Sequence, residues 1–228
     1  MGNCTELQSR QLKDFESLSS EVKQELLRTS ESLSIPKGEV IFKENQPLHK
    51  LYCINKGACK FSKVDNIGQE HVLRFLGKGE IMGKRSLLTN NGAEVSAVAL
   101  SDIELCCLDK NTFLKSLKEN PGFLQDFLDV LIEDVNINEY TRIIFCVHKG
   151  IKQRLAHLLV YLLKKYGADR NGRLWVRLKR EDMATVLGTS PEYVINLLTN
   201  FKNAGLINTV RSEIHVLSKE GLERIGNS

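Results

Sequence analysis

Long apolar runs are missing from this sequence of 228 residues. No stretch reaches the roughly 20 consecutive apolar residues that a membrane-spanning helix needs, and Met1–Leu18 is too polar for a secretory signal peptide. Hydrophobic residues make up 42% of the chain and charged residues 26%, which is typical of a globular protein with one or two cores. We therefore expect a cytoplasmic protein without a membrane partner.

Paired cysteine motifs are also missing, although the chain contains six cysteines. They are Cys4, Cys53, Cys59, Cys106, Cys107 and Cys146. The absence of CxxC spacing argues against a zinc finger or ribbon. In a cytoplasmic protein most of these thiols should be reduced, and several should be buried. We interpret Cys4 as a mobile, inert terminal residue, and a solvent-exposed redox thiol is the alternative.

Catalytic constellations are the third absence. The chain offers no Ser/His/Asp set and no metal-ligand set, and Gly77–Glu80 (GKGE) is too short for a phosphate-binding Walker loop. We expect no enzymatic activity.

Charge is present but unevenly divided. From His148 onward there are 14 Lys/Arg and 7 Asp/Glu, a net charge of +7, whereas the preceding residues carry 18 and 21, a net charge of −3. A basic C-terminal third is typical of a nucleic-acid-binding end attached to a different domain.

The most informative motif is Arg180–Leu198 (REDMATVLGTSPEYVINLL), which has the spacing of two short helices joined by a tight turn. Met183, Ala184 and Leu187 share one face of the first helix. Gly188 can adopt the left-handed backbone that ends this helix at little cost.

The second helix of the motif is expected to begin at Pro191, after Thr189 and Ser190 as capping residues. Its apolar face is formed by Val194, Leu197, Leu198 and Phe201. This pattern predicts a helix-turn-helix, and two ordinary amphipathic helices are the alternative. The outward residues, which in a helix-turn-helix reach base edges, are Glu192, Tyr193, Asn196 and Asn200.

Short strands flank this motif. Two of them, around Arg211–Glu213, indicate a β-wing, and Gly172–Leu178 alternates apolar and polar residues like one more strand.

The N-terminal half changes its period along the chain. Leu12–Leu33 carries apolar residues at helical spacing and predicts one or two short helices. From Ile35 the period becomes two, with closely spaced glycine turns, and strands resume in Glu94–Leu108. Such a run of short strands predicts a small β-roll or jelly roll.

Pro121–Phe145 returns to helical character. Its residues at alternating three- and four-residue steps form a coiled-coil-like stripe that starts apolar and becomes polar at Asn138 and Arg142. A long helix of this kind is well placed to pair with its twin, so we expect a homodimer, although a buried helix of a monomer would show the same stripe. The predicted fold is α+β, with a β-roll and flanking helices over residues 1–118, a connecting and dimerisation helix over 119–147, and a winged helix-turn-helix over 148–228.

This order of segments resembles the cyclic AMP receptor protein/fumarate-nitrate regulator (CRP/FNR) family of bacterial transcription regulators across nearly the whole chain. The resemblance rests on PKGEVIFKEN, KLYCINKGACKFSK, GKGEIMG, KQRLAHLLVYL and the helix-turn-helix with its wing. It implies a sensor domain like a cyclic-nucleotide-binding domain, followed by a DNA-binding winged helix.

The resemblance is weaker in the effector pocket. Family members that bind cyclic AMP carry a Gly-Glu pair for the ribose and a later Arg-Ser pair for the phosphate. Here Lys84 follows Gly83, and the later segment has Glu94 but no arginine. Because a carboxylate repels a phosphodiester, we do not expect cyclic AMP to bind. Lys84 and Arg85 either hold another anion or form a solvated surface turn. The full set implied as an effector pocket is Gly83, Lys84, Arg85, Ser86, Glu94, Ser96, Asn138, Glu139 and Arg142.

Some members of the family sense oxygen through an iron–sulfur cluster or gas through haem. Cys106 lies near the place of one cluster ligand, but the N-terminal group of cysteines is missing. The histidines show no spacing that singles out a haem ligand. We expect neither cofactor.

In the DNA-binding end, Glu192 matches the family's recognition-helix glutamate, which can accept a hydrogen bond from a cytosine amino group. The arginines that commonly flank it are replaced by Pro191 and Asn196, so a different half-site is expected. Asn196 and Asn200 can read adenine. The candidates for phosphate contacts, which position the domain, are Lys179, Arg180, Thr189, Ser190, Lys202 and Arg211.

The expected function is a sequence-specific transcription regulator that binds an inverted-repeat operator in double-stranded DNA as a homodimer, with RNA polymerase as a further candidate partner. The alternative is a small-molecule or protein-binding module whose winged helix serves as a docking surface. A steep salt dependence of DNA binding separates the two. The sequence does not identify the effector.

Overall fold

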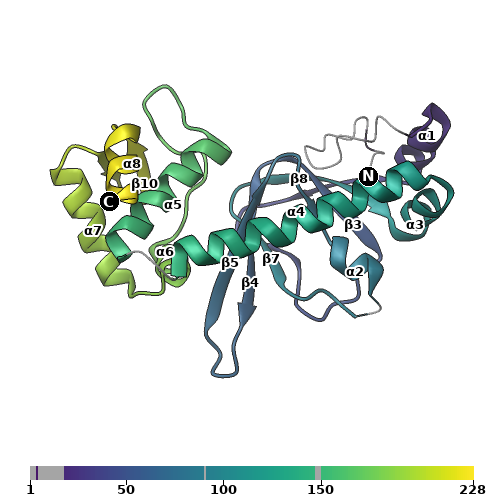
Figure 1. Ribbon diagram of the computed structural model, residues 1–228, viewed down its shortest axis with the longest axis horizontal. Coiled ribbons are helices and arrows are strands. Elements are labelled where there is room, and N and C mark those ends of the chain that lie inside the picture. Colours follow the sequence, from purple (N-terminus) through teal and green to yellow (C-terminus); the bar gives the residue numbers. More distant parts are fainter. Residues whose placement is uncertain (1–3, 5–17, 90, 147–149) are drawn as a thin grey trace. The chain divides into compact units, whose positions relative to one another are not determined.

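The computed structural model describes residues 4, 18–89, 91–146 and 150–228, and the side chains of residues 133 and 136–146 lie outside this description. The chain forms two compact units, which can be followed by colour in Figure 1. The first unit comprises Met1–Lys63 and Arg74–Ile137, and the second comprises Val64–Leu73 and Asn138–Ser228.

Eight strands are described between Glu31 and Asp109. They are β1 (Glu31–Ile35), β2 (Val40–Phe42), β3 (Lys50–Lys56), β4 (Ala58–Val64), β5 (Glu70–Gly77), β6 (Ile81–Met82), β7 (Ser96–Ala99) and β8 (Ile103–Asp109). They form two four-stranded sheets with the orders β1-β8-β3-β6 and β2-β7-β4-β5. β8 pairs antiparallel with both β1 and β3, so it lies inside the first sheet.

Strand β8 is buried on both faces. Leu105 and Cys107 belong to the core between the two sheets, whereas Cys106 and Leu108 belong to a second core under the helices. Because successive side chains of a strand point to opposite faces, the continuous apolar run of β8 follows from having both faces covered.

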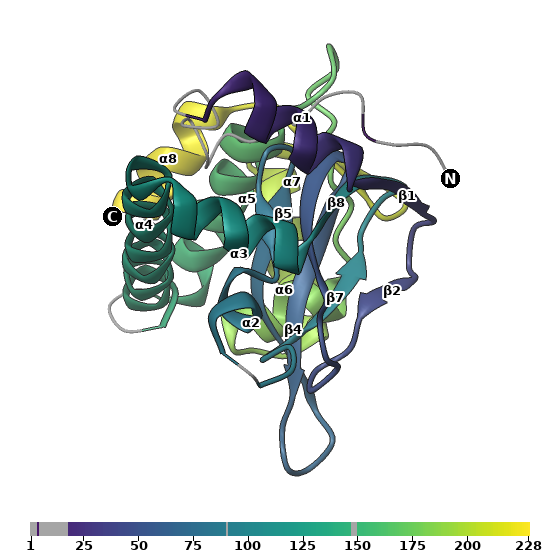
Figure 2. The same cartoon turned by 90° about the vertical axis from the view of Figure 1, so that its right-hand side faces the viewer.

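Helices cover the outer face of the first sheet. They are α1 (Ser20–Arg28), α3 (Lys110–Glu119) and the first part of α4 (Pro121–Cys146), and a short helix, α2 (Lys84–Leu88), follows β6. Figure 2 shows α1 and α3 crossing in front of this sheet. The ring of Phe113 on α3 packs edge-on against Phe123 and Phe127 of α4, with centroids 5.4 and 5.3 Å apart.

The prediction of helix over Leu12–Leu33 is only partly right. Ser19 caps α1 by accepting a hydrogen bond from the N–H of Val22, as its position before an acidic turn suggests. The prediction is wrong for residues 31–33, which belong to β1, because Leu33 lies opposite Leu105 of β8. Residues 12–17 lie outside the described part of the chain.

Helix α4 has one buried and one exposed apolar face. The buried side chains are Phe123, Phe127, Val130 and Asp134. The exposed apolar side chains are Leu124, Leu128, Ile132 and Val135. Of the predicted stripe, Leu124, Leu128 and Val135 lie on this exposed face, whereas Leu131 is half-buried and packs against the core of the first unit. Among the helices described, none combines the length and apolarity needed to cross a membrane.

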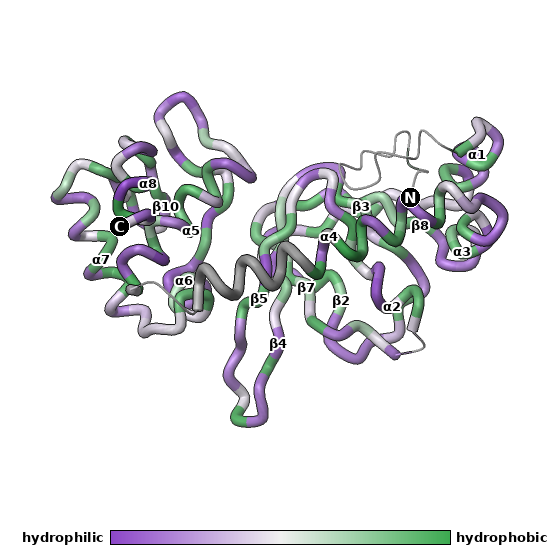
Figure 3. The backbone as a smooth tube through the Cα atoms, in the orientation of Figure 1, coloured by the Kyte–Doolittle hydropathy of each residue, from purple (hydrophilic) through white to green (hydrophobic). Residues whose placement is uncertain are grey.

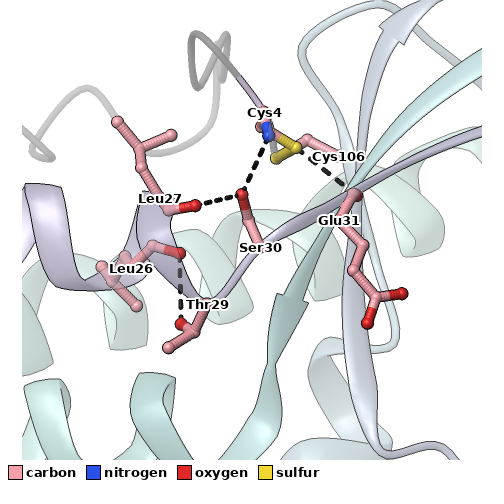
Figure 4. The surroundings of a disulfide bond; sticks show 7 residues. All are labelled: Cys4, Leu26, Leu27, Thr29, Ser30, Glu31 and Cys106. Atoms are coloured by element: carbon pink, nitrogen blue, oxygen red, sulfur yellow. Dashed lines mark hydrogen bonds between the residues drawn. A yellow bond between two sulfur atoms is a disulfide. The ribbon is translucent and has the colours of Figure 1, made fainter. Parts of the chain in front are cut away.

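The interpretation of Cys4 as a mobile, inert terminal residue is wrong. Cys4 is buried and forms a disulfide with Cys106, 102 residues away in sequence (Figure 4). Cys53, Cys59 and Cys107 are free thiols and are buried. Spacing could not reveal this bond, because the β-roll alone brings β8 next to the residues that precede β1.

The second unit contains four helices and a two-stranded wing among the described residues. They are α5 (Ile151–Tyr166), α6 (Arg180–Leu187), α7 (Pro191–Asn203), β9 (Ile207–Val210), β10 (Glu213–Val216) and α8 (Lys219–Asn227). α5 packs against α8, and α6 packs against α7. β9 and β10 pair antiparallel, with Val210 opposite Glu213.

The predicted strand Gly172–Leu178 is wrong as a continuous strand. Burial does alternate along it, since Leu174, Val176 and Leu178 are buried, but only Arg173 and Leu174 form β-bridges, with His215 and Ala168. The alternation records which side chains face the core. A strand also needs a partner backbone along its whole length, which this segment lacks.

Candidate DNA-binding surface and effector pocket

The turn between α6 and α7 is closed by a glycine. Gly188 has a φ of 62°, and its N–H bonds to the carbonyl oxygens of Ala184 and Thr185. The N–H of Thr189 follows with a 3.0 Å bond to the Ala184 carbonyl oxygen. These bonds satisfy the last carbonyls of α6, and only glycine adopts this φ without steric cost. The local sequence therefore sets the direction in which α7 leaves the turn.

Helix α7 begins with a serine cap and a proline. The Ser190 hydroxyl accepts a 3.3 Å hydrogen bond from the N–H of Tyr193, and Pro191 occupies the first turn. Hydrogen bonding from the Ser190 side chain, and then from its own backbone N–H, holds the pKa of the exposed Glu192 carboxyl below its usual value. Glu192 is therefore an ionised acceptor fixed at the N-terminal end of α7.

Helix α7 separates its two faces cleanly, as the alternating colours of its tube in Figure 3 indicate. Its buried residues are Val194, Leu197, Leu198 and Phe201. Its exposed residues include the predicted base-reading set, Glu192, Tyr193, Asn196 and Asn200, together with Ile195, Thr199 and Lys202. Ile195 and Thr199 were not in the predicted set, although the helical period places both on the outward side. These side chains, with Asn203, form one exposed and mostly polar surface on α7.

The predicted phosphate contacts differ in exposure. Lys179 and Lys202 are exposed, and Arg211 lies exposed in the wing turn with a φ of 54°. Arg180 is half-buried with Nη1 3.9 Å from the Met183 sulfur, and burial lowers the pKa of its guanidinium. Thr189 is half-buried. The exposed cations thus lie before α6, on α7 and at the wing.

The wing is held by a carboxylate outside the predicted set. Glu213 on β10 accepts hydrogen bonds from Arg177 and, at 3.4 Å, from Arg173, which also pairs with Asp169 at 3.0 Å. Arg173 and Arg177, which count toward the basic C-terminal third, are therefore paired with acidic groups, as is Lys164 with Glu223. Charge counting cannot distinguish such pairs from free cations.

Within the first unit, four charged side chains form a buried ion-pair network: Arg74, Glu80, Lys84 and Asp134. Lys84 Nζ lies 2.5 Å from Asp134 Oδ2. Arg74 bridges Asp134 at 3.1 Å and Glu80 at 2.9 Å, and Glu80 also accepts a 2.8 Å hydrogen bond from the N–H of Gly77. The network therefore ties α4, through Asp134, to β5 and the start of α2.

Burial and charge act against each other in this network. Burial raises the pKa of Asp134, but Lys84 and Arg74 outweigh it, so the net shift is downward. The pKa of Lys84 is lowered by burial, against the attraction of Asp134. The carboxylate of Asp134 and the ammonium of Lys84 thus stabilise one another's charged forms against the cost of burial.

The predicted effector residues differ in burial and in the partners that they bind. Lys84 is buried, with 6% of its side-chain surface exposed, so it is not part of a solvated turn. Arg85 is exposed and pairs with Glu94 at 3.0 Å. Ser86 donates to the Gly92 carbonyl oxygen, and Ser96 accepts from the N–H of Glu44.

Other predicted effector residues are backbone features or lie on α4. Gly83 has a φ of 86° at the start of α2, where an added Cβ would lie 3.3 Å from the Lys50 carbonyl oxygen. The side chains of Asn138, Glu139 and Arg142 lie outside the described part of the structure. The structure thus brings together Lys84 and Asp134, and does not bring Lys84 and Arg85 together around one anion.

Arg74, Glu80 and Asp134 were missed by sequence reasoning. One signal was available: Asp134 occupies the next position of the buried face that Phe123, Phe127 and Val130 define on α4. A carboxylate at such a position requires a cationic partner. Which cation supplies it could not be read from spacing. Among the described residues, no group of three or more His, Cys, Asp or Glu side chains could hold a metal ion.

Two family models match the chain in the order of its parts. The cyclic nucleotide-binding domain matches residues 32–120, and the Crp-like helix-turn-helix domain matches residues 153–225. The matched ranges contain the β-roll and the helix-turn-helix with its wing.

Curated relatives and solved structures agree with these matches. The CRP-like cAMP-activated global transcriptional regulator of Mycobacterium tuberculosis is 25% identical over 87% of this chain and 89% of its own length. The global nitrogen regulator of a Nostoc species is 27% identical over 82% of this chain and 86% of its own. The structure of FixK2 from Bradyrhizobium japonicum has a TM-score of 0.75 at 17% identity and covers 86% of this chain and 96% of that one. The predicted fold, a β-roll followed by a helix-turn-helix, is confirmed.

Proposed function

This chain belongs to the CRP/FNR family of transcription regulators and carries that family's helix-turn-helix DNA-binding domain, and from this premise we propose that it binds an inverted-repeat operator as a homodimer without cyclic AMP. The observation that carries the proposal is α7, whose capped N-terminus presents Glu192 and whose exposed face presents two asparagines. Glutamate accepts from cytosine, and asparagine pairs with adenine, in the major groove. The exposed cations Lys179, Lys202 and Arg211 supply phosphate contacts that position α7.

The homodimer is supported by the exposed apolar face of α4. Leu124, Leu128, Ile132 and Val135 would stay in water in a monomer. A contiguous apolar face of this kind marks an interaction site, and a second copy of α4 offers the same face in a twofold arrangement. A twofold dimer places two recognition helices about 34 Å apart, one turn of DNA.

The residues of the β-roll do not fit a cyclic nucleotide. The Mycobacterium tuberculosis relative is described as activated by cyclic AMP. In this chain Lys84 stands at the ribose-binding position and is engaged by Asp134 in a buried pair, and Glu94 stands where a phosphate-binding arginine is needed. The ion-pair network takes over the link between β-roll and α4. We likewise propose that neither haem nor an iron–sulfur cluster is bound, and that the protein is a cytoplasmic regulator without enzymatic activity, with RNA polymerase as a candidate partner.

The first test is selection of binding sites from a random duplex library with the full-length protein at two salt concentrations. A palindromic motif, bound less tightly at the higher salt, supports the proposal. Glu192→Ala should relax one position in each half-site, whereas Glu220→Ala, an exposed glutamate on α8, should return the parent motif. The same motif from parent and Glu192→Ala would contradict the role of Glu192, and no binding at either salt would favour a docking module.

The dimer is tested separately. Leu128→Glu places a carboxylate in the exposed face of α4, so we expect the dimer dissociation constant to rise at least about tenfold. Lys115→Glu on α3 adds the same charge at an exposed position outside that face and should leave the constant unchanged. Sedimentation equilibrium measures both. Equal constants for the two variants would place the dimer contact elsewhere.

A further inference from the structure

The Cys4–Cys106 disulfide joins the N-terminal residues to the inner strand of the first sheet (Figure 4). Cys106 lies on β8 between Ser32 of β1 and Cys53 of β3, and its side chain is fully buried. The backbone N–H of Cys4 donates to the Ser30 hydroxyl at 3.2 Å, and that hydroxyl donates to the Leu27 carbonyl oxygen at 2.7 Å. The bond is thus seated at the junction between α1 and β1.

This disulfide is part of the core that holds α4. Cys4 and Cys106 belong to one hydrophobic cluster with Leu26 of α1, Phe113 of α3 and Phe127 of α4. In the first unit this cluster seats the N-terminal half of α4, opposite the exposed face that we assign to the dimer contact. A change at the disulfide therefore alters the same core against which α4 packs.

The other thiols near the disulfide are poor competitors for it. Burial raises the pKa of Cys53, which lies opposite Cys106, to about 12, and it raises the pKa of Cys107 to about 11. Since the thiolate is the attacking species, the raised pKa values disfavour exchange of either thiol with the disulfide at neutral pH. Cys4 is 8% exposed whereas Cys106 is fully buried, so an external thiol meets the sulfur of Cys4 first.

Disulfides are rare in cytoplasmic proteins, and those that occur are mostly catalytic or redox-sensing. We propose that Cys4–Cys106 is a redox switch: the disulfide form is competent to bind DNA, and a cytoplasmic dithiol reductant converts it to a form that binds DNA weakly. This inference rests on the proposed function as a DNA-binding regulator.

The chemistry is a balanced thiol–disulfide exchange. A thiolate of the dithiol attacks the Cys4 sulfur and releases the Cys106 thiolate, which takes a proton. The second thiol of the reductant, as a thiolate, then attacks the reductant sulfur that is bonded to Cys4. The reductant becomes a cyclic disulfide, and Cys4 leaves and takes a proton to become a thiol. Two electrons pass from the dithiol, which becomes a disulfide, to the protein, and a small-molecule disulfide reverses the process.

Reduction removes a covalent tie between residues 102 apart and frees Cys4 to leave the cluster. The hydrophobic cluster then loses the buried Cys4 side chain next to α1 and α3. Phe123 and Phe127 of α4 therefore pack against a less rigid core. Because the exposed face of α4 is presented by the same helix, its pairing with the second copy weakens. The population with both recognition helices placed for DNA falls accordingly.

The test measures DNA binding and thiol content together. The full-length protein is equilibrated in buffers of reduced and oxidised dithiothreitol, and its dissociation constant for a labelled duplex of the selected motif is measured by fluorescence anisotropy. Thiols are counted in parallel by alkylation after denaturation and mass spectrometry. We expect two more thiols on full reduction, with a rise of at least about fivefold in the dissociation constant, and both changes should share one midpoint.

Two variants keep the test decisive. Cys4→Ser removes the bond at the less buried cysteine and should bind duplex weakly in every buffer, whereas Cys107→Ala keeps the disulfide and should respond like the parent. A dissociation constant that stays unchanged while two thiols appear overturns the switch, and so does a constant thiol count. Tight binding by Cys4→Ser would overturn it as well. Failure of the oxidised parent to bind any duplex would instead overturn the proposed function, and the switch with it.

Discussion

The β-roll and the helix-turn-helix use their polar side chains in opposite ways. In the β-roll, Lys84 and Asp134 point inward and satisfy one another. On α7, Glu192 and the asparagines point outward and have no buried role. The first unit thus satisfies these charges within the chain and is called the closed side below. The exposed face of α7 leaves its polar side chains available to DNA and is called the open or recognition side.

The largest expected effect comes from breaking the closed side. Asp134→Asn leaves Lys84 buried without its main counter-charge, so we expect the free energy of unfolding to fall by about 3–5 kcal/mol. Asp129→Asn, an exposed carboxylate five residues earlier on the same helix, should change it by less than about 0.5 kcal/mol. Urea unfolding of both variants measures the difference. A small loss for Asp134→Asn would show that the network adds little.

Acid should open the same network. Because the folded-state pKa of Asp134 lies below its ordinary value of 3.8, its contribution to stability is present above that value and is lost as pH falls through the lower, folded-state pKa. The difference in unfolding free energy between parent and Asp134→Asn should therefore be constant above about pH 5 and shrink at lower pH. Thermal unfolding across this range measures it, and a difference that shrinks already near neutral pH would contradict the lowered pKa.

A substitution at the N-terminus of α7 should change the unfolding free energy little and the selected DNA motif more. Ser190→Ala removes the cap of α7, with an expected loss of about 1 kcal/mol in unfolding free energy, and it frees Glu192 from the hydroxyl that holds it. Selection with this variant should relax the position that Glu192 reads. Thr185→Ala, whose hydroxyl bonds within α6 to the Glu181 carbonyl oxygen, is the matched control and should retain the parent motif.

The smallest expected effect is that of cyclic AMP. A ligand at 100 times its dissociation constant would stabilise the folded protein by about 2.7 kcal/mol. Because Lys84 is engaged by Asp134, and Glu94 adds a carboxylate to the segment where cyclic-AMP-binding members carry an arginine, we expect no change in melting temperature at millimolar cyclic AMP. A rise in melting temperature would show that the network opens for a nucleotide, and would remove the contrast between the two regions.

Much of the recognition side could be predicted because its signals are local. Gly188, Ser190 and Pro191 act on groups within five residues, and the helical period sorts Val194 from Asn196. The apolar stripe of α4 was also visible in the sequence, but the sequence did not show which face of the helix is buried. Leu128 is exposed and Phe127 buried, and a pattern of three- and four-residue steps fits either face.

The closed side was predicted less well because its contacts join residues that are distant in sequence. Lys84 was interpreted as an anion-binding or surface residue, since spacing does not show that Asp134 reaches it. Leu33 became part of a strand because β8 lies beside it. The second unit has one failure of the same kind, since Gly172–Leu178 alternates in burial but forms β-bridges only at Arg173 and Leu174.

The sequence by itself determined the elements that depend on neighbours along the chain: the capped start of α7, the glycine that ends α6, the alternation of the β-roll and the family resemblance that follows from their order. Only the tertiary structure decided which charges and thiols meet. Arg74 and Asp134 are 60 residues apart, and Cys4 and Cys106 are 102 apart. Caps and periods depend on the geometry of a single helix or strand, whereas these pairs exist only after β8 and α4 pack in one core, and packing is specified by the whole set of buried side chains.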